Sequence, residues 1–183
     1  MKEKKLLIVV DYQKDFVSGA LGFAGAETLD GRIAEKIRAC RAAGGTVAFT
    51  LDTHGEDYLA TQEGRKLPVA HCVRGSDGWA LYGKTAEERR PEDLCFEKPT
   101  FPSLALADYL AREQFTVIEL VGLVSHMCVL SNAVMAKAAA PEAEIVIDAQ
   151  CTASFDPALH EKALDVMEAL QMTVTGRRKD LSI

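Results

Sequence analysis

The most regular feature of the chain is a set of short, continuous apolar runs separated by segments with helical spacing. The three strongest runs lie at residues 6–10, 46–51 and 117–121. Runs of this length are too short to cross a membrane and are typical of strands buried on both faces of a parallel sheet. Weaker runs at residues 94–97, 145–147 and 172–175 predict three further strands.

Between these runs, apolar residues recur three or four positions apart, which is the spacing of one helix face. The spacing predicts helices at residues 29–43, 104–114 and 158–171, and another that begins near Cys128. Residues 53–90 are polar and aperiodic, and loops of this length inside a compact domain are usually functional. The alternation of strands and helices predicts an α/β fold: a Rossmann-like, three-layer α/β/α sandwich with a central, mainly parallel sheet.

Composition narrows the class of protein. The 183 residues are 48% hydrophobic, which suits one compact domain spanning residues 1–183. The net charge of -6 argues against nucleic acid or an anionic membrane as a partner. The five cysteines form no Cys-x-x-Cys pair, so neither a disulfide framework nor a thiolate zinc site is indicated. No apolar stretch reaches the length of a signal-peptide core or a membrane span, and we expect a cytoplasmic protein.

Cys128 stands where a predicted strand gives way to a predicted helix. The run at 117–121 ends at Gly122, Ser125 can cap the following helix, and Cys128 then falls in its first turn. Ligands of open α/β sheets bind at the carboxyl ends of the strands, and a helix N-terminus lowers the pKa of a thiol. Cys128 is therefore either a nucleophile or, like most cysteines, a small buried hydrophobe.

Other reactive residues follow the remaining predicted strands. Asp11, Asp52 and Lys98 each come directly after an apolar run, and parallel strands bring their carboxyl ends to one edge of the sheet. Asp11 could accept the proton of Cys128, and the ammonium of Lys98 would favour the thiolate. Backbone N–H groups at the start of the Cys128 helix could stabilise an oxyanion. Taken singly, Asp11 is more often a turn or helix cap, and Lys98 more often an ion-pair partner of Glu97 or Asp11.

The long segment after residue 52 holds two of the four histidines. Asp52 and His54 are two residues apart, so their side chains point to the same side of an extended chain, and His71 follows later. Carboxylate and imidazole groups suit zinc, manganese or iron. The pattern predicts a divalent metal site, although such residues are more often ordinary surface groups.

Five motifs carry a family resemblance: VVDYQKDF (9–16), LDTH (51–54), HCVRGSDG (71–78), EKPTF (97–101) and GLVSHMCV (122–129). In this order and spacing they resemble the nicotinamidase/pyrazinamidase branch of the isochorismatase-like cysteine hydrolases. The resemblance covers nearly the whole chain, and a chance match of all five motifs is improbable.

The resemblance implies that Asp11, Lys98 and Cys128 form a catalytic triad. It also implies a cis peptide bond at Val124–Ser125, and an oxyanion site built from the backbone at Val124, Ser125 and Cys128. The implied reaction is hydrolysis of nicotinamide to nicotinate and ammonia through a Cys128 thioester, with Asp11 moving the protons.

The resemblance further implies that Asp52, His54 and His71 bind one divalent metal ion, with zinc expected first and manganese or iron as alternatives. The ion would hold the ring nitrogen of the substrate and place the amide over the nucleophile. Some members have another ligand between the two histidines. The acidic residues near that place are Glu63, which we expect to be the ligand, and its competitors Glu56 and Asp57.

The substrate pocket departs from the family pattern. Many nicotinamidases have an aromatic residue shortly before the second histidine ligand, where this chain has LPVA (67–70). We expect Phe16 and Phe101 to supply the missing wall for the ring, unless they are ordinary core residues. Gln13 and Pro68 complete the expected pocket.

Two other functions stay open. One is an isochorismatase-like amidohydrolase that acts on a different small amide or carbamoyl group, although the metal-free branches lack the Asp-x-His pair and the later histidine. The other is a catalytically silent binding module, against which the intact triad argues. We expect a small-molecule amide substrate, no nucleic-acid or membrane partner, and a homo-oligomer.

Overall fold

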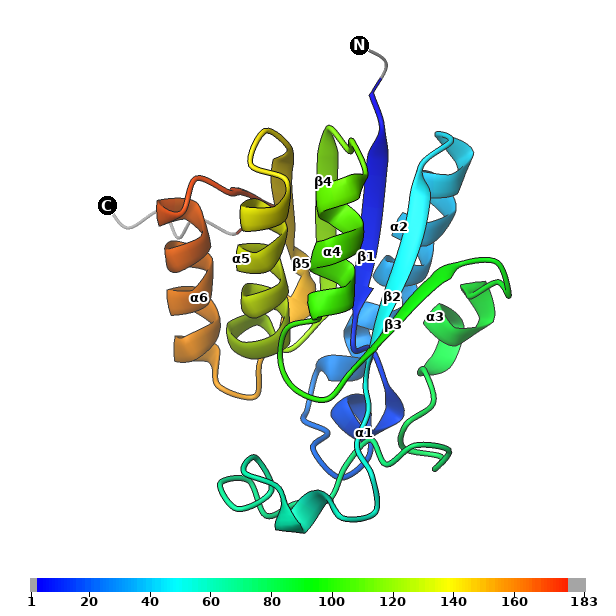
Figure 1. Ribbon diagram of the computed structural model, residues 1–183, viewed down its shortest axis with the longest axis vertical. Coiled ribbons are helices and arrows are strands. Elements are labelled where there is room, and N and C mark those ends of the chain that lie inside the picture. The colour runs from blue at the N-terminus through cyan, green and yellow to red at the C-terminus, as the bar shows by residue number, and fades with distance from the viewer. Residues whose placement is uncertain (1–2, 178–183) are drawn as a thin grey trace.

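The computed structural model of the protein describes residues 3–177. Its centre is a six-stranded sheet with the strand order β3-β2-β1-β4-β5-β6, in which every pairing is parallel (Figure 1). The strands are β1 (Lys5–Val10), β2 (Thr46–Asp52), β3 (Leu94–Lys98), β4 (Val117–Leu123), β5 (Glu144–Ala153) and β6 (Thr173–Thr175). The predicted α/β class and the parallel sheet are confirmed.

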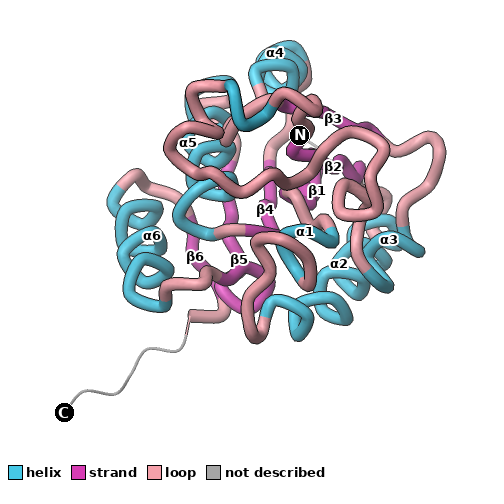
Figure 2. Tube along the Cα trace, turned by 90° about the horizontal axis from the view of Figure 1, so that it is seen from below, coloured by secondary structure: helices cyan, strands magenta, loops and turns pink. Residues whose placement is uncertain are grey.

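Helices cover both faces of this sheet. They are α1 (Lys14–Val17), α2 (Asp30–Ala42), α3 (Gly83–Glu88), α4 (Leu104–Arg112), α5 (Leu130–Ala139) and α6 (Pro157–Ala169). The view in Figure 2 shows α4, α5 and α6 on one side of the strands, and α2 with α3 beside it on the other. Within residues 3–177, no helix has the length and apolar character needed to span a bilayer.

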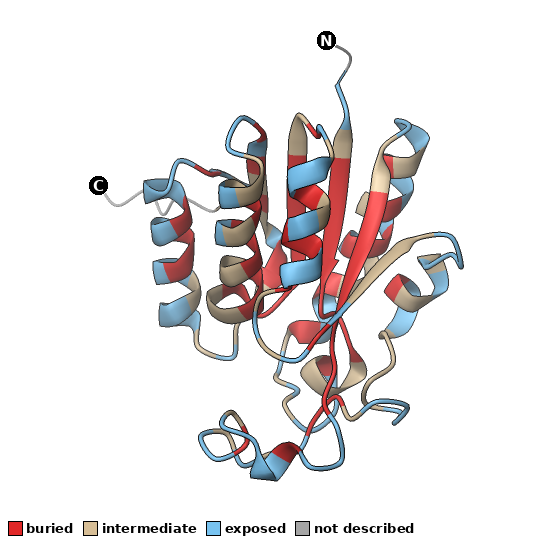
Figure 3. Cartoon of the chain, viewed as in Figure 1, coloured by how far each residue is buried: buried red, intermediate tan, exposed pale blue. Residues whose placement is uncertain are grey.

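The central strand β1 divides the core into two halves, because successive side chains of a strand point to opposite faces. Leu6, Ile8 and Val10 pack in the layer formed with α4, α5 and α6, whereas Leu7 and Val9 pack in the layer formed with α2. All five side chains are fully buried (Figure 3). Full burial of one such side chain contributes about 1.5–3 kcal/mol, so β1 is a rigid base for the residues that follow it.

Local sequence signals account for the helix ends. Gly44 follows α2 in the left-handed conformation (φ 77°), which glycine adopts without strain. The hydroxyl of Ser103 accepts the N–H of Leu106 at 3.1 Å and caps α4. The carboxylate of Asp156 accepts two N–H groups at the start of α6, at 2.9 and 3.0 Å. The bounds of α2, α4 and α6 lie within a few residues of the prediction, whereas the short helices α1 and α3 were not predicted.

Two strands differ from the prediction. Gly122 does not end β4 but lies inside it with φ 111°, and a Cβ at this position would come 2.1 Å from the carbonyl oxygen of Val10. This glycine therefore allows β4 to approach β1 closely. Strand β5 continues past Asp148 to Ala153, because the pairing with β4 shifts register and then resumes at Thr152. The polar residues around this irregularity concealed the second half of the strand.

Candidate active site

Three side chains from different strands meet at the carboxyl edge of the sheet. Asp11 follows β1 with φ 46°, Lys98 ends β3, and Cys128 lies in the helical turn Ser125–Val129 after β4. The Nζ of Lys98 lies 2.6 Å from Asp11 Oδ2 and 3.5 Å from Cys128 Sγ, and it donates to the carbonyl of Thr100 at 3.0 Å. Thr50 Oγ1 donates to the other oxygen of Asp11 at 2.6 Å. Since Asp11 is 0%, Lys98 1% and Cys128 6% exposed, these interactions are shielded from bulk water.

Burial and the neighbouring charges set the protonation of this cluster. Burial raises the pKa of Cys128 well above its usual range, and the charge of Asp11 adds to this effect while Lys98 opposes it. Burial also raises the pKa of Asp11 and outweighs the opposing ion pair with Lys98. For Lys98 itself, burial lowers the pKa, but the negative charges of Asp11, Cys128 and Asp52 outweigh burial and raise it. Burial therefore works against the low-pKa thiolate that we expected from the sequence, and Lys98 works in its favour.

Asp52, at the end of β2, lies between two histidines. Its Oδ2 is 2.9 Å from His54 Nε2 and 3.3 Å from His71 Nε2, and all three side chains are buried. The three possible ligand atoms lie within 4.8 Å of one another. The ring of Tyr58 packs against both imidazoles, with centroid distances of 4.6 and 4.9 Å. His71 Nδ1 faces the carbonyl of Val69 at 2.8 Å, which leaves Nε2 available as a ligand.

The chemistry of these donors fits a divalent metal ion. A carboxylate and two imidazole nitrogens form a set that zinc and related ions use. Burial raises the pKa of Asp52, but the hydrogen bonds with His54 and His71 and the charge of Lys98 lower it by more, so the carboxylate is ionised. A buried, ionised ligand of this kind needs a compensating cation.

Glu63 is the best placed of the three acidic candidates for a fourth ligand. Its Oε1 lies 3.9 Å from His54 Nε2, and its side chain is 17% exposed. Glu56 and Asp57 are exposed residues, whereas Glu63 lines the same cavity as His71. The placement favours Glu63.

A cavity of about 420 Å³ lies over both clusters. Its polar lining consists of Asp52, Glu63, His71 and Cys128. The remaining lining is apolar: Phe16, Ala20, Leu21, Gly22, Leu67, Phe101, Val124, Met127 and Phe155. Lys98 Nζ also lies 3.3 Å from Asp52 Oδ1, so one ammonium connects the cysteine cluster with the Asp–His cluster. The cavity suits a small, largely apolar ligand with polar groups that face both clusters.

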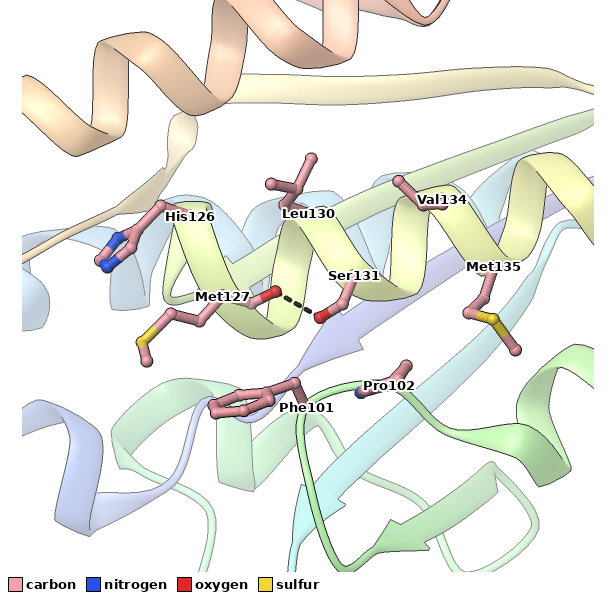
Figure 4. A pocket seen from close by; sticks show the side chains of 8 residues that line it. All are labelled: Phe101, Pro102, His126, Met127, Leu130, Ser131, Val134 and Met135. Atoms are coloured by element: carbon pink, nitrogen blue, oxygen red, sulfur yellow. Dashed lines mark hydrogen bonds between the residues drawn. The ribbon is translucent and has the colours of Figure 1, made fainter. Parts of the chain in front are cut away.

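A second, apolar groove of about 520 Å³ runs beside this cavity along α5 (Figure 4). It is lined by Phe101, Pro102, His126, Met127, Leu130, Ser131, Val134 and Met135. Phe101 and Met127 line both the groove and the cavity, and Figure 4 shows their side chains facing each other between the helix and the loop. These two side chains therefore lie at the boundary between the cavity and the groove.

The turn that carries Cys128 differs from the prediction in two respects. The cis peptide bond is Leu123–Val124, one residue earlier than expected. Ser125 does not cap the helix, because the N-cap residue is Val124, which makes no side-chain hydrogen bond. The Ser125 hydroxyl instead pairs with His160 Nδ1 at 2.9 Å.

Two of the four expected pocket residues line the cavity: Phe16 and Phe101. Gln13 is fully buried, and its side-chain amide pairs with the backbone of Asp52, donating to the carbonyl at 2.9 Å and accepting the N–H at 2.7 Å. Pro68 is exposed, and neither it nor Gln13 is among the residues that line the cavity. The pocket assignment of Gln13 and Pro68 was wrong, and Gln13 instead fixes the backbone of Asp52.

Thr50 and Phe155 are among the residues of the site that were not predicted from the sequence. Thr50, which holds Asp11, was a polar residue inside an apolar run, and that was the available signal. Phe155 lines the cavity although it is 58% exposed, and its ring contacts those of His126 and Phe23 at centroid distances of 5.2 and 6.3 Å. A lone aromatic residue before a helix start gave no signal in the sequence.

Residues 5–178 match the family model of the isochorismatase domain. The chain belongs to the isochorismatase family. A similar solved structure is the nicotinamidase/pyrazinamidase of Bacillus subtilis, with 31% identity, coverage of 93% of this chain and 98% of that chain, and a TM-score of 0.84. No curated protein sequence matches the chain.

Two more distant structures share the isochorismatase-like fold. A pyrazinamidase of Pyrococcus horikoshii in complex with zinc is 23% identical over 93% of this chain and 98% of that chain, with a TM-score of 0.81. An N-carbamoylsarcosine amidase of Thermoplasma acidophilum is 23% identical over 93% and 95% of the two chains, with a TM-score of 0.77. The predicted family and the nicotinamidase branch are confirmed, and the protein is an isochorismatase-family hydrolase.

Proposed function

We propose that this hydrolase is a metal-dependent nicotinamidase, which converts nicotinamide and water to nicotinate and ammonia. The observation that carries the proposal is the position of Lys98. Its ammonium contacts Asp11, Cys128 and Asp52, so a thiol nucleophile and a cation site share one cavity. A volume of about 420 Å³ and a mostly apolar lining suit a planar aromatic amide. The likeness to the Bacillus subtilis nicotinamidase supports the same substrate.

The first half of the proposed reaction forms a thioester. Cys128 Sγ attacks the amide carbon while its proton passes to Asp11, as the raised pKa of the thiol requires. Lys98 stabilises the negative charge as it moves from Asp11 to the sulfur and oxygen atoms. The backbone N–H groups of Val124 and Cys128 are the proposed oxyanion donors. The C–N bond then breaks, and ammonia leaves with the proton held by Asp11.

The second half releases the acid. Asp11 accepts a proton from water as the water oxygen attacks the thioester carbon. The C–S bond breaks, and Asp11 returns this proton to the sulfur of Cys128. The products are the carboxylic acid and the free thiol, so the enzyme is regenerated without an external acid or base.

Three residues would hold the divalent ion, namely Asp52, His54 and His71, with Glu63 as the proposed fourth ligand and zinc as our first choice. Bound there, the ion would supply a ligand position for the pyridine nitrogen. Gln13 keeps Asp52 in place through its two backbone hydrogen bonds. Phe16 packs edge-on against His71 at 5.6 Å and closes the ring pocket beside this site.

Ammonia release from nicotinamide tests the proposal. The protein is loaded with zinc, manganese or iron and assayed with and without a chelator, beside Cys128→Ala and the control Cys95→Ala. Cys95 is a half-buried cysteine of β3 and is not among the residues lining the cavity. We expect the Cys128 variant to lose activity by more than about 10³-fold, or roughly 4 kcal/mol in barrier, and the control to retain it.

Other outcomes would redirect the assignment. Hydrolysis of a carbamoyl substrate by metal-loaded protein that leaves nicotinamide intact would indicate the other amidase class. Absence of ammonia release from every amide tested would indicate a binding module.

A further inference from the structure

Two successive residues of the nucleophile turn, Ser125–Val129, are bound to one segment that follows β5. Ser125 Oγ lies 2.9 Å from His160 Nδ1, and His126 Nδ1 lies 2.9 Å from Ser154 Oγ. Ser154 Oγ also accepts the N–H of Asp156 at 2.9 Å, so its own proton is available for His126. The segment 154–160 thus holds the start of the turn through two hydroxyl–imidazole pairs.

The end of the turn is held differently. Asn132, on α5, donates its side-chain N–H to the carbonyl of Cys128 at 2.8 Å and to that of Phe101 at 3.0 Å. The Ser131 hydroxyl donates to the carbonyl of Met127. These contacts fix the turn where it joins α5, whereas the side-chain contacts of its first two residues are made with segment 154–160.

The Ser125 pair is the more enclosed of the two. Ser125 is fully buried, and its hydroxyl faces the imidazole of His160, which projects from the first turns of α6. His160 Nε2 lies 3.9 Å from Glu161 Oε1, which favours a proton on Nε2 and leaves Nδ1 as the acceptor of the Ser125 O–H. A buried hydroxyl that loses such a partner is costly, so the pair fixes the orientation of the turn.

We propose that His160 is a positioning residue that holds the nucleophile turn through Ser125, and thereby aims Cys128 and its backbone N–H at the substrate carbonyl. This inference rests on the proposed function for the reaction that is measured. The positioning itself does not depend on which amide is hydrolysed.

Protonation of His160 would remove the acceptor for Ser125. The groups that face His160 are Glu161 on its own helix, Arg32 and Arg177, which line the same small cavity, and His126 on the turn. Burial lowers the pKa of His160, Glu161 opposes this effect, and Arg177 adds to it. His160 is therefore neutral at neutral pH, and the Ser125 hydrogen bond weakens as the pH falls through the lowered pKa.

The test compares His160→Leu, His160→Asn and Ser125→Ala with the control Lys162→Leu, an exposed position of the same helix. Leucine removes the acceptor, whereas the asparagine oxygen can take the place of Nδ1. We expect His160→Leu and Ser125→Ala each to lower kcat about tenfold with little change in KM, as for the loss of one buried hydrogen bond. The double variant should lose no more than the worse single one, because both remove the same interaction.

The asparagine variant separates positioning from stability. We expect it to recover most of kcat. Because asparagine does not titrate, kcat of this variant should also fall less at acidic pH than kcat of the wild type. Additive losses in the double variant, an asparagine variant no better than leucine, or wild-type kcat in His160→Leu would overturn the proposal. If the wild type hydrolyses no amide, the rate of Cys128 alkylation by iodoacetamide in the same variants is the readout, and equal rates would be decisive against it.

Discussion

Replacing Lys98 by methionine tests the arrangement of the site most directly. Methionine keeps most of the apolar stem and removes the ammonium that lies 2.6 Å from Asp11, 3.3 Å from Asp52 and 3.5 Å from Cys128. We expect kcat to fall steeply and the alkylation of Cys128 to shift to higher pH, because Lys98 is the group that opposes the rise in the thiol pKa.

The size of the effect follows from the burial of the pair. Asp11 is 0% exposed, and without Lys98 the Thr50 hydroxyl and the Cys128 thiol are its remaining side-chain partners among residues 3–177. Removing one partner of a buried ion pair costs roughly 3–5 kcal/mol, and Asp11 escapes part of this cost by binding a proton. A protonated Asp11 cannot accept the Cys128 proton, and loss of a general base lowers a rate by about 10²–10⁴-fold.

The free energy of unfolding that Lys98→Met loses should increase as the pH rises. Burial already raises the pKa of Asp11, and loss of Lys98 removes the charge that opposes this rise. A raised pKa in the folded state stabilises the protein at pH values below the unfolded pKa, near 4, and this contribution is lost as the pH rises. The destabilisation of Lys98→Met should therefore be large at neutral pH and shrink toward pH 4.

Ammonia release, a pH–alkylation curve and thermal melts are the measurements. Lys84→Met, on the exposed side of α3, is the matched control. The double variant Lys98→Met/Asp11→Asn removes both charges and should recover stability without activity. Lys98→Arg should not restore kcat, because a planar guanidinium does not occupy the place of a compact ammonium. An unshifted alkylation curve with kcat within about tenfold of wild type would refute the reasoning, since it would mean that Lys98 is worth no more than a surface ion pair.

Three further predictions concern the nucleophile, the metal and the pocket. Iodoacetamide should label Cys128 before Cys95, because Cys128 lines the cavity and Asp11 can take its proton. Mass spectrometry of the peptides measures the order of labelling, and the reverse order would count against a nucleophilic role. When protein that holds the ion at roughly 100 times its Kd is treated with a chelator, its Tm should fall by about 5–10 °C, and in His71→Ala the chelator should leave Tm unchanged. A wild-type Tm that does not respond to the chelator, together with no bound metal by elemental analysis, would exclude the site. Phe155→Ala should raise KM for nicotinamide about two- to tenfold, and the exposed control Leu170→Ala should not; equal KM values would remove Phe155 from the pocket.

The central strands were predictable because burial on both faces leaves a plain signal. β1 and β2 are continuous apolar runs, and their observed bounds differ from the prediction by one residue. The second half of β5 was not predictable, because it contains Asp148 and Gln150 around a shift in register. The alternation of apolar and polar residues along a strand is interrupted where the register shifts, so the sequence of such a segment predicts a loop.

The candidate site was predictable where it depends on topology. Asp52 and Lys98 end β2 and β3, and Asp11 directly follows the neighbouring strand β1, so their convergence follows from the strand order. The direction of the shift in the Cys128 pKa was not predictable, because it depends on the burial of the thiol and on the carboxylate of Asp11, which lies near it only in the folded chain. The hydrogen bonds of the Gln13 side chain with the backbone of Asp52 were also not predictable, because the two residues are close only in the folded chain.

The charges of the cavity explain why a metal and a lysine belong to one site. Lys98 lies closer to Asp11 (2.6 Å) than to Asp52 (3.3 Å), so its charge is directed mainly to Asp11. The buried carboxylate of Asp52, with the half-buried Glu63 beside it, then needs a second source of positive charge, because buried anions are costly unless they are paired. Burial lowers the pKa of His71, but the hydrogen bond with Asp52 and the negative charges nearby outweigh burial and raise it, so the site favours positive charge at this imidazole. A divalent cation would supply all of it at the same nitrogen atom, which makes proton release the natural accompaniment of metal binding.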